Sequence, residues 1–148
     1  MSDEFPQAVL RIRLSQTDAH YGGNLVPGSR IVELFGDLAT ELCVRMDGDE
    51  GLFAAYEEIS FTAPVHAGDF LEVRGRIIGA GQTSRRMAFE ARKYVIPRPE
   101  ISESAAEVLE EPLVVARAIG TCVVQTTRQR GRAATRLARD VEHLFDEG

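Results

Sequence analysis

The chain has 148 residues, of which 44% are hydrophobic and 27% are charged, and its formal net charge is -6 at pH 7. This length and composition predict one globular domain over residues 1–148, with a core that needs no disulfide or metal. The acidic balance argues against a nucleic-acid partner, so an anionic ligand would need a local basic patch.

The first predicted elements are a strand and a long helix, separated by a turn that contains two glycines. Apolar and polar side chains alternate over residues 8–15, which is typical of a strand with one apolar face. The polar residues 17–24 form the turn. Over residues 27–46, apolar side chains recur at helical spacing, which predicts a helix with Pro27 in its first turn.

Four more strands are predicted after the helix, at residues 51–62, 69–79, 83–96 and 113–125. Residues 97–112 hold three prolines and several acidic residues, so we expect an exposed excursion there, with a partly helical stretch at residues 105–109. Residues 132–145 have the spacing of a short amphipathic helix. The order predicts an α+β fold, one antiparallel sheet wrapped around one helix, whose open edge would pair with a second subunit.

Cysteines, histidines and the amino-terminal residues exclude several other classes. Cys43 and Cys122 show no C-x-x-C spacing, so we expect buried free thiols. The histidines and cysteines together show no metal-ligand spacing, and we expect no metal. Residues 1–7 lack the pattern of a signal peptide, and no apolar run approaches the ~18 residues of a membrane span. We therefore expect a cytoplasmic protein with no membrane partner.

The element order and three motifs together resemble a known family. The run Thr17-Asp18-Ala19-His20-Tyr21-Gly22-Gly23-Asn24 is followed by Gly36-Asp37-Leu38-Ala39-Thr40-Glu41 and then by Pro64-Val65-His66-Ala67-Gly68-Asp69. The order is that of the hotdog fold. Over about residues 8–96 the chain resembles the 3-aminobutyryl-CoA ammonia-lyases and the related β-alanyl-CoA ammonia-lyases. The last motif is also common in hotdog thioesterases, whereas the first two are more specific.

The resemblance implies an activity: reversible loss of ammonia from 3-aminobutyryl-CoA, or a similar 3-aminoacyl-CoA, to give crotonyl-CoA or its analogue, as in lysine fermentation. It implies an acyl-CoA substrate and ammonium as small-molecule partners. No separate cofactor is expected, because coenzyme A is part of the substrate. The fold family also suggests a homo-oligomer, at least a dimer, with a hexamer built from dimers as the expected assembly.

Such an elimination needs a base for the α-proton and donors for the thioester oxygen. The two-residue period of strands places Glu57 on the same face as Phe53, Ala55 and Ile59. A carboxylate on an apolar face would have a raised pKa, which suits a general base. The alternative is a solvated glutamate, or a bulge between Glu57 and Glu58.

The glycine turn supplies candidates for the other roles. Gly22, Gly23 and Asn24 lead into a helix start, where free N–H groups and the positive end of the helix dipole would bind the thioester oxygen. A plain glycine turn is the alternative. Asp18 and His20 form an Asp-x-His pair that resembles hydratase chemistry in other hotdog enzymes, with His20 as a proton shuttle or as a structural histidine.

Asp37 and Glu41 lie one turn apart on the predicted helix, where like charges mildly destabilise it. We interpret the pair as a site for the substrate ammonium group; the alternative is a solvated face with Arg30 and Arg45 as partners.

The phosphates of coenzyme A need basic or hydroxyl groups near the site. Thr83, Ser84 and Arg85, with Arg86 beside them, follow a predicted hairpin and are the first candidate. The second is the set Arg128, Arg130, Arg132, Arg136 and Arg139. Either set could instead be a solvated face.

Three functions remain open at this point: an ammonia-lyase, a hotdog acyl-CoA thioesterase that uses Asp37 or Glu57, and a non-catalytic acyl-CoA binder. The Asp37 and Glu41 pair favours the lyase, because a thioesterase has no substrate cation to hold. A carboxylate on an apolar face favours an enzyme over a binder.

Overall fold

The structure is a computed structural model, and it describes residues 5–131. The helix predicted at residues 132–145 lies outside the described residues. Within them the elements follow the order β1 (Gln7–Arg13), α1 (Gly28–Asp47), β2 (Leu52–Phe61), β3 (Phe70–Ala80), β4 (Ser84–Pro97) and β5 (Ala106–Val123). Short 3-10 turns lie at Gln16–Asp18, Gly22–Asn24 and Thr126–Arg128.

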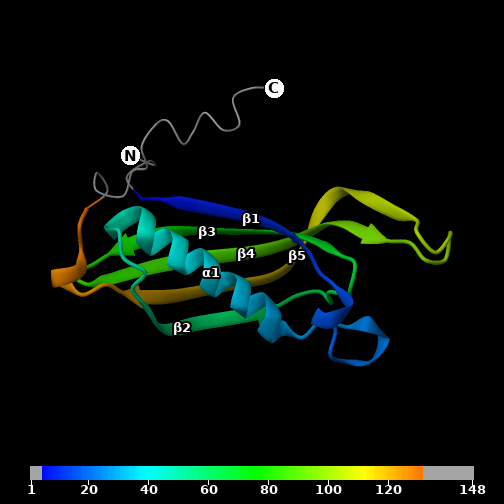
Figure 1. The fold of residues 1–148 in the computed structure, drawn as a ribbon, viewed down its shortest axis with the longest axis horizontal. Helices are drawn as coiled ribbons and strands as arrows, with labels where there is room; N and C mark the ends of the chain where they lie inside the picture. Colours follow the sequence, from blue (N-terminus) through cyan, green and yellow to red (C-terminus); the bar gives the residue numbers. More distant parts are fainter. Residues whose placement is uncertain (1–4, 132–148) are drawn as a thin grey trace, which may run out of the picture.

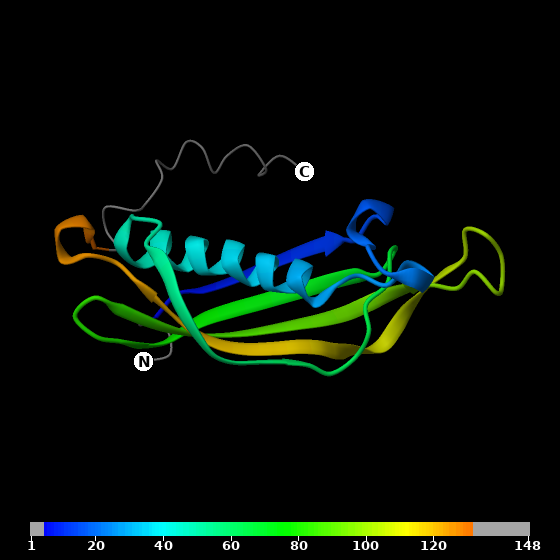
Figure 2. The ribbon, with the colours of Figure 1, turned by 90° about the horizontal axis from the view of Figure 1, so that it is seen from below.

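The five strands form one antiparallel sheet in the order β1-β3-β4-β5-β2, and α1 lies along one face of it (Figure 1). Figure 2 shows the opposite face of the sheet uncovered by any described element. The predicted α+β arrangement, one sheet around one long helix, is therefore confirmed. No helix within residues 5–131 is long and apolar enough to cross a membrane.

The core lies between α1 and the strands. The apolar stripe of α1, with Ile31, Leu34, Leu38 and Leu42 at helical spacing, is buried against alternate residues of β3 and β4. Gly48, at φ 71°, ends the helix in the left-handed conformation, and its N–H donates to the carbonyl of Val44 at 2.8 Å.

The core face of the last strand carries small residues. Ala116, Ala118, Gly120 and Cys122 of β5 are buried. A Cβ atom on Gly120 would lie 2.5 Å from the ring of Phe53, so only glycine permits this approach. Cys43 and Cys122 are buried free thiols, as predicted.

The segment at residues 97–112 is exposed, as predicted, but the partly helical stretch and the strand start at residue 113 are wrong. β5 begins at Ala106, and Ala106, Glu107 and Val108 pair with Pro97, Ile96 and Val95 of β4. Only residues 98–105 are a loop, and residues 105–109 are not helical. Along the ladder, the pair of Val95 with Val108 is followed by the pair of Lys93 with Leu113. Residues 109–112 of β5 therefore bulge opposite the single residue Tyr94 of β4. Pro112 is tolerated there because a bulged residue need not donate to the ladder. Together these residues form an arm that projects beyond the sheet (Figures 1 and 2).

Candidate active site at the start of the helix

A mostly apolar pocket of about 480 Å³ lies at the amino-terminal end of α1. Its walls come from the turn before the helix, from the first helical turn, and from the end of β2 with the residues that follow it. The lining residues are Tyr21, Leu25, Val26, Pro27, Gly28, Ile31, Phe61, Thr62, Ala63, Pro64 and Val65. The volume and lining suit a short aliphatic group.

The helix start presents unused hydrogen-bond donors to this pocket. Pro27 is the N-cap residue, and no side chain caps the helix. The Arg30 N–H donates to the Pro27 carbonyl at 3.1 Å, whereas the N–H groups of Gly28 and Ser29 have no partner within residues 5–131. Free amides at the positive end of a helix dipole stabilise a negatively charged oxygen.

Phe61 and Tyr21 are pocket residues that sequence reasoning did not single out. A Cβ atom on Gly28 would lie 2.7 Å from the Phe61 ring, so the glycine lets the ring close over the helix start. Phe61 is 52% and Tyr21 59% exposed, which is unusual for aromatic side chains. Tyr21 sits inside the glycine motif, and this position was the only signal that could have found it.

The glycine turn is positioned by backbone contacts. Gly23 and Asn24 have φ values of 71° and 61°, and the Asn24 carbonyl accepts the N–H of Ala67 at 2.9 Å. Gly22, Gly23 and Asn24 are all exposed, and Leu25, Val26 and Pro27 separate them from the helix. The expected oxyanion role therefore fits the first amides of α1 better than the glycine turn itself.

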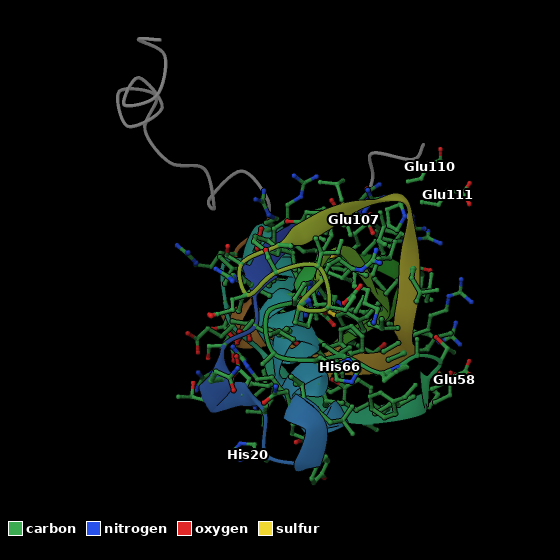
Figure 3. All side chains as sticks on the ribbon, turned by 90° about the vertical axis from the view of Figure 1, so that its right-hand side faces the viewer. His20, Glu58, His66, Glu107, Glu110 and Glu111 are labelled. Carbon is green, nitrogen blue, oxygen red and sulfur yellow. The ribbon has the colours of Figure 1, made fainter. Side chains whose placement is uncertain are left out.

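The Asp18 and His20 pair is not formed. Asp18 accepts the Ser15 N–H at 2.8 Å and the Arg30 guanidinium at 2.9 Å, which ties the turn to the helix. The hydrogen bond from the Ser15 backbone, with that from Arg30, holds the pKa of Asp18 below its usual range. His20 is exposed, has no hydrogen-bond partner among the described residues, and projects from the rim in Figure 3. Asp18 thus joins the turn to α1 and does not orient His20.

Asp37 and Glu41 lie on the face of α1 away from the sheet. Asp37 is exposed and has no partner within residues 5–131. Glu41 forms an ion pair with Arg45 at 2.7 Å, as expected if this helix face is solvated. Arg30 does not pair with Asp37 or Glu41, because it pairs with Asp18 and Glu33. Neither carboxylate lines the pocket.

The expected burial of Glu57 is wrong, and the alternative, a solvated glutamate beside a bulge, is confirmed. The pairing of β2 with β5 shifts register between Phe53 and Ala55 and again between Tyr56 and Glu58, so Phe53, Tyr56 and Ile59 face the core. The side chain of Glu57 is 50% exposed and forms an ion pair with Arg86 at 2.6 Å. This hydrogen-bonded contact lowers the pKa of Glu57, the reverse of what a general base near neutrality needs.

Arg85 is not available to bind phosphate. It is buried, and its guanidinium holds Asp47 at the end of α1 through two hydrogen bonds of 2.8 and 3.0 Å. Thr83 and Ser84 lie in the same hairpin, where Ser84 Oγ accepts the Gly81 N–H at 3.2 Å. This hairpin lies at the opposite end of α1 from the pocket, about 30 Å along a 20-residue helix. One chain therefore does not bring the two halves of the predicted site together.

Comparison with known proteins gives close relatives. No protein-family model matches the chain. A 3-aminobutyryl-CoA ammonia lyase of Acetoanaerobium sticklandii is 59% identical over 124 residues, which are 84% of this chain and 98% of that protein. A β-alanyl-CoA:ammonia lyase from Clostridium propionicum superposes with a TM-score of 0.82 at 40% identity, covering 86% of this chain and 90% of its own.

More distant structures share the fold. A hexameric hotdog-fold thioesterase of Campylobacter jejuni superposes with a TM-score of 0.65 at 14% identity, covering 93% of this chain and 94% of its own. At that identity the match shows only the architecture, and with the two ammonia lyases it confirms the predicted hotdog fold.

Proposed function

Because the chain belongs to the 3-aminobutyryl-CoA ammonia-lyase family, we propose that it is a carbon–nitrogen lyase acting on 3-aminobutyryl-CoA or a similar 3-aminoacyl-CoA. It removes ammonia reversibly to give crotonyl-CoA or the matching 2-enoyl-CoA. The expected cytoplasmic location and role in lysine degradation remain proposals that follow from this assignment.

The single structural observation that supports this function is the uncapped start of α1 beneath an apolar pocket. When a base removes the proton next to a thioester carbonyl, negative charge develops on the carbonyl oxygen. The free N–H groups of Gly28 and Ser29 can donate to that oxygen, and the helix dipole adds to the stabilisation. The pocket walls, including Ile31 and Phe61, accept the short alkyl chain.

The pocket lining contains no carboxylate and no imidazole, so we propose that a second copy completes the site. β2 is an edge strand of the described sheet, and Leu52 at its start is 73% exposed, with Phe61 exposed at its end. Antiparallel pairing of two β2 strands would place the start of one beside the end of the other. The partner's helix end and Thr83 hairpin would then approach this pocket.

In that dimer the α-proton acceptor would be an exposed carboxylate of one of the two copies. Asp37 on α1 and Glu50 just before β2 are both exposed and have no partner among the described residues. We propose these two for the roles of base and ammonium ligand, in place of Glu57. In elimination, the base takes the α-proton, the C–N bond breaks, and the nitrogen leaves with its electron pair as ammonia.

The test is to incubate the protein with crotonyl-CoA and ammonium, following enoyl-thioester absorbance and free thiol together. A lyase removes the absorbance only when ammonium is present and releases no thiol. Asp37→Asn and Glu50→Gln should each be compared with Glu57→Gln as the matched control. Thiol release that does not depend on ammonium would instead identify an acyl-CoA thioesterase.

A further inference from the structure

The face of the sheet opposite α1 is hollowed into a groove of about 830 Å³ that crosses all five strands. Small and apolar residues contribute to the groove, among them Ala88, Ala118 and Ile119, and arginines contribute too, namely Arg74, Arg76 and Arg117. No described element covers this face (Figure 2). We call this surface the arginine groove.

The arginine groove and its surroundings carry excess positive charge, although the chain as a whole is acidic. Two glutamates there each accept ion pairs from two arginines: Glu72 from Arg11 and Arg74 at 2.9 and 2.7 Å, and Glu90 from Arg92 and Arg117 at 2.6 and 2.9 Å. Each group therefore keeps one uncompensated positive charge. Arg76 is exposed and has no partner within residues 5–131, which adds another, whereas Glu58, which also lines the groove, offsets one of these charges. The groove and its surroundings remain net positive.

The arm formed by residues 94–113 has the opposite charge. Glu110 and Glu111 lie on the bulge of β5, have no partner among the described residues, and project outward in Figure 3. Glu100 and Glu107 share a single arginine, Arg98. The arm therefore presents a surplus of carboxylates.

The arm also exposes large apolar side chains. Val108 is 73%, Ile101 66% and Leu113 47% exposed. Large apolar side chains exposed on one projecting hairpin are typical of a contact surface. Apolar side chains flanked by carboxylates match a groove that combines small apolar residues with arginines.

We propose that the arm of one copy docks in the arginine groove of another copy. The arm continues the β4–β5 ladder past the end of its own sheet, so it cannot reach its own groove without breaking that ladder. Because the two surfaces are different, the contact is heterologous and joins copies head to tail. It is separate from the β2 edge, so the two contacts together would join dimers into a larger assembly.

Opposite charges in this contact offset the general repulsion between copies whose net charge is -6. The contact depends on charge, so high salt should weaken it more than it weakens pairing of strand edges. This inference does not rest on the lyase activity, because it concerns only how copies assemble.

The experiment measures the mass of the full-length protein by light scattering coupled to gel filtration, at low and at 1 M salt. The wild type should be larger than a dimer at low salt and should fall toward a dimer at high salt. Glu110→Arg with Glu111→Arg should give a dimer at low salt, and so should Arg76→Glu with Arg117→Glu. The variant that carries all four reversals should regain the larger mass.

Two matched controls make the result specific. Glu33→Arg on the exposed face of α1, and Arg128→Glu in the last described turn, change the charge without touching either surface, and both should keep the wild-type mass. A wild type no larger than a dimer would overturn the proposal, as would arm reversals that leave the mass unchanged. Failure to regain mass in the four-fold variant, with its circular dichroism unchanged, would also overturn it. Lyase assays on the same samples report on the proposed function separately.

Discussion

At the scale of single residues, the contact between Gly28 and Phe61 shapes the pocket. We predict that Gly28→Ala lowers kcat/KM for crotonyl-CoA by about tenfold or more, because the new methyl group would displace the Phe61 ring and shift the acyl group from the helix amides. Thermal unfolding should change little, since the ring is exposed and can move. Steady-state kinetics measure the effect.

Gly36→Ala is the matched control on the same helix, because a Cβ atom there would meet no other atom within 4 Å. It should leave activity unchanged and stabilise the helix by about 0.5–1 kcal/mol, the usual gain of alanine over glycine. Equal activity losses in both variants would contradict a specific role for the Phe61 contact.

A second residue-scale prediction concerns Glu57. Its ion pair with Arg86 is about half exposed on both sides, so Glu57→Gln should leave the midpoint of urea unfolding nearly unchanged. The activity should stay within about twofold of wild type, because the carboxylate lies outside the pocket and its pKa is lowered by Arg86. Loss of turnover with an unchanged KM would restore Glu57 as the base.

Sequence reasoning misplaced Glu57 because it assumed an unbroken strand period, and two bulges in β2 rotate the side chains between Phe53 and Glu58. Bulges leave little trace in a single sequence. Arg85 is different, since simple alternation with Met87 and Phe89 already places it on the core face of β4. Its partner Asp47 could not be found from the sequence, because the two residues meet only when the hairpin packs on the helix end.

At the scale of elements, the Asp47 and Arg85 pair fastens α1 to β4. Both side chains are at most 5% exposed. We predict that Arg85→Met lowers the unfolding free energy by about 3–5 kcal/mol, because Asp47 would remain charged and buried without its partner. Urea unfolding of the full-length protein measures this.

The double variant Asp47→Leu with Arg85→Met should lose less stability than Arg85→Met alone, because it leaves no unpaired charge. A double variant that is less stable than either single variant would mean that the attraction between Asp47 and Arg85 exceeds the cost of burying their two charges.

The elements also show where the sequence is informative. The helix and the faces of β3 and β4 follow from apolar spacing, because α1 and the sheet bury one face each. The arm was mistaken for a loop because it has little core to bury, so Val108 and Leu113 stay exposed and the pattern of a strand is weak. Its three prolines reinforced the mistake, although Pro112 lies in the bulge and Pro99 in the loop.

A further element-scale prediction tests the edge of β2. Ala54 is exposed on this edge strand, and Ala54→Lys should block pairing of two β2 strands by placing like charges near each other. In the Glu110→Arg and Glu111→Arg background, which should be a dimer, we expect Ala54→Lys to halve the mass. The lyase activity should fall at least tenfold, with unchanged circular dichroism. Thr127→Lys, at an exposed position in the last turn, is the control. Full activity from a monomer would refute a shared site.

At the scale of the whole molecule, the structure divides its charge by region. The arginine groove and the acidic arm lie on different parts of one chain, and each contains ion pairs among its own residues. A chain whose net charge is -6 can thus attract its own copies locally while it repels them at a distance. The acidic arm is separate from the arginine groove because β4 and β5 remain paired beyond the end of the sheet. The amino-acid composition alone does not reveal this pairing.

The same carboxylates make the stability depend on pH in a defined direction. Hydrogen bonds from Ser15 and Arg30 lower the pKa of Asp18, and arginine partners lower those of Glu72 and Glu90 against the opposing effect of burial. A folded-state pKa below the unfolded value gives stability that is present above about pH 4 and is lost as the pH falls through the folded pKa.

We therefore predict an unfolding free energy that is nearly constant from pH 7 to about pH 5 and decreases steadily toward pH 3, as urea unfolding can measure. In Asp18→Asn the unfolding free energy should decrease less between pH 5 and pH 3, because an asparagine at position 18 takes up no proton. Stability that is unchanged between pH 5 and pH 3 would show that these ion pairs do not hold the sheet together.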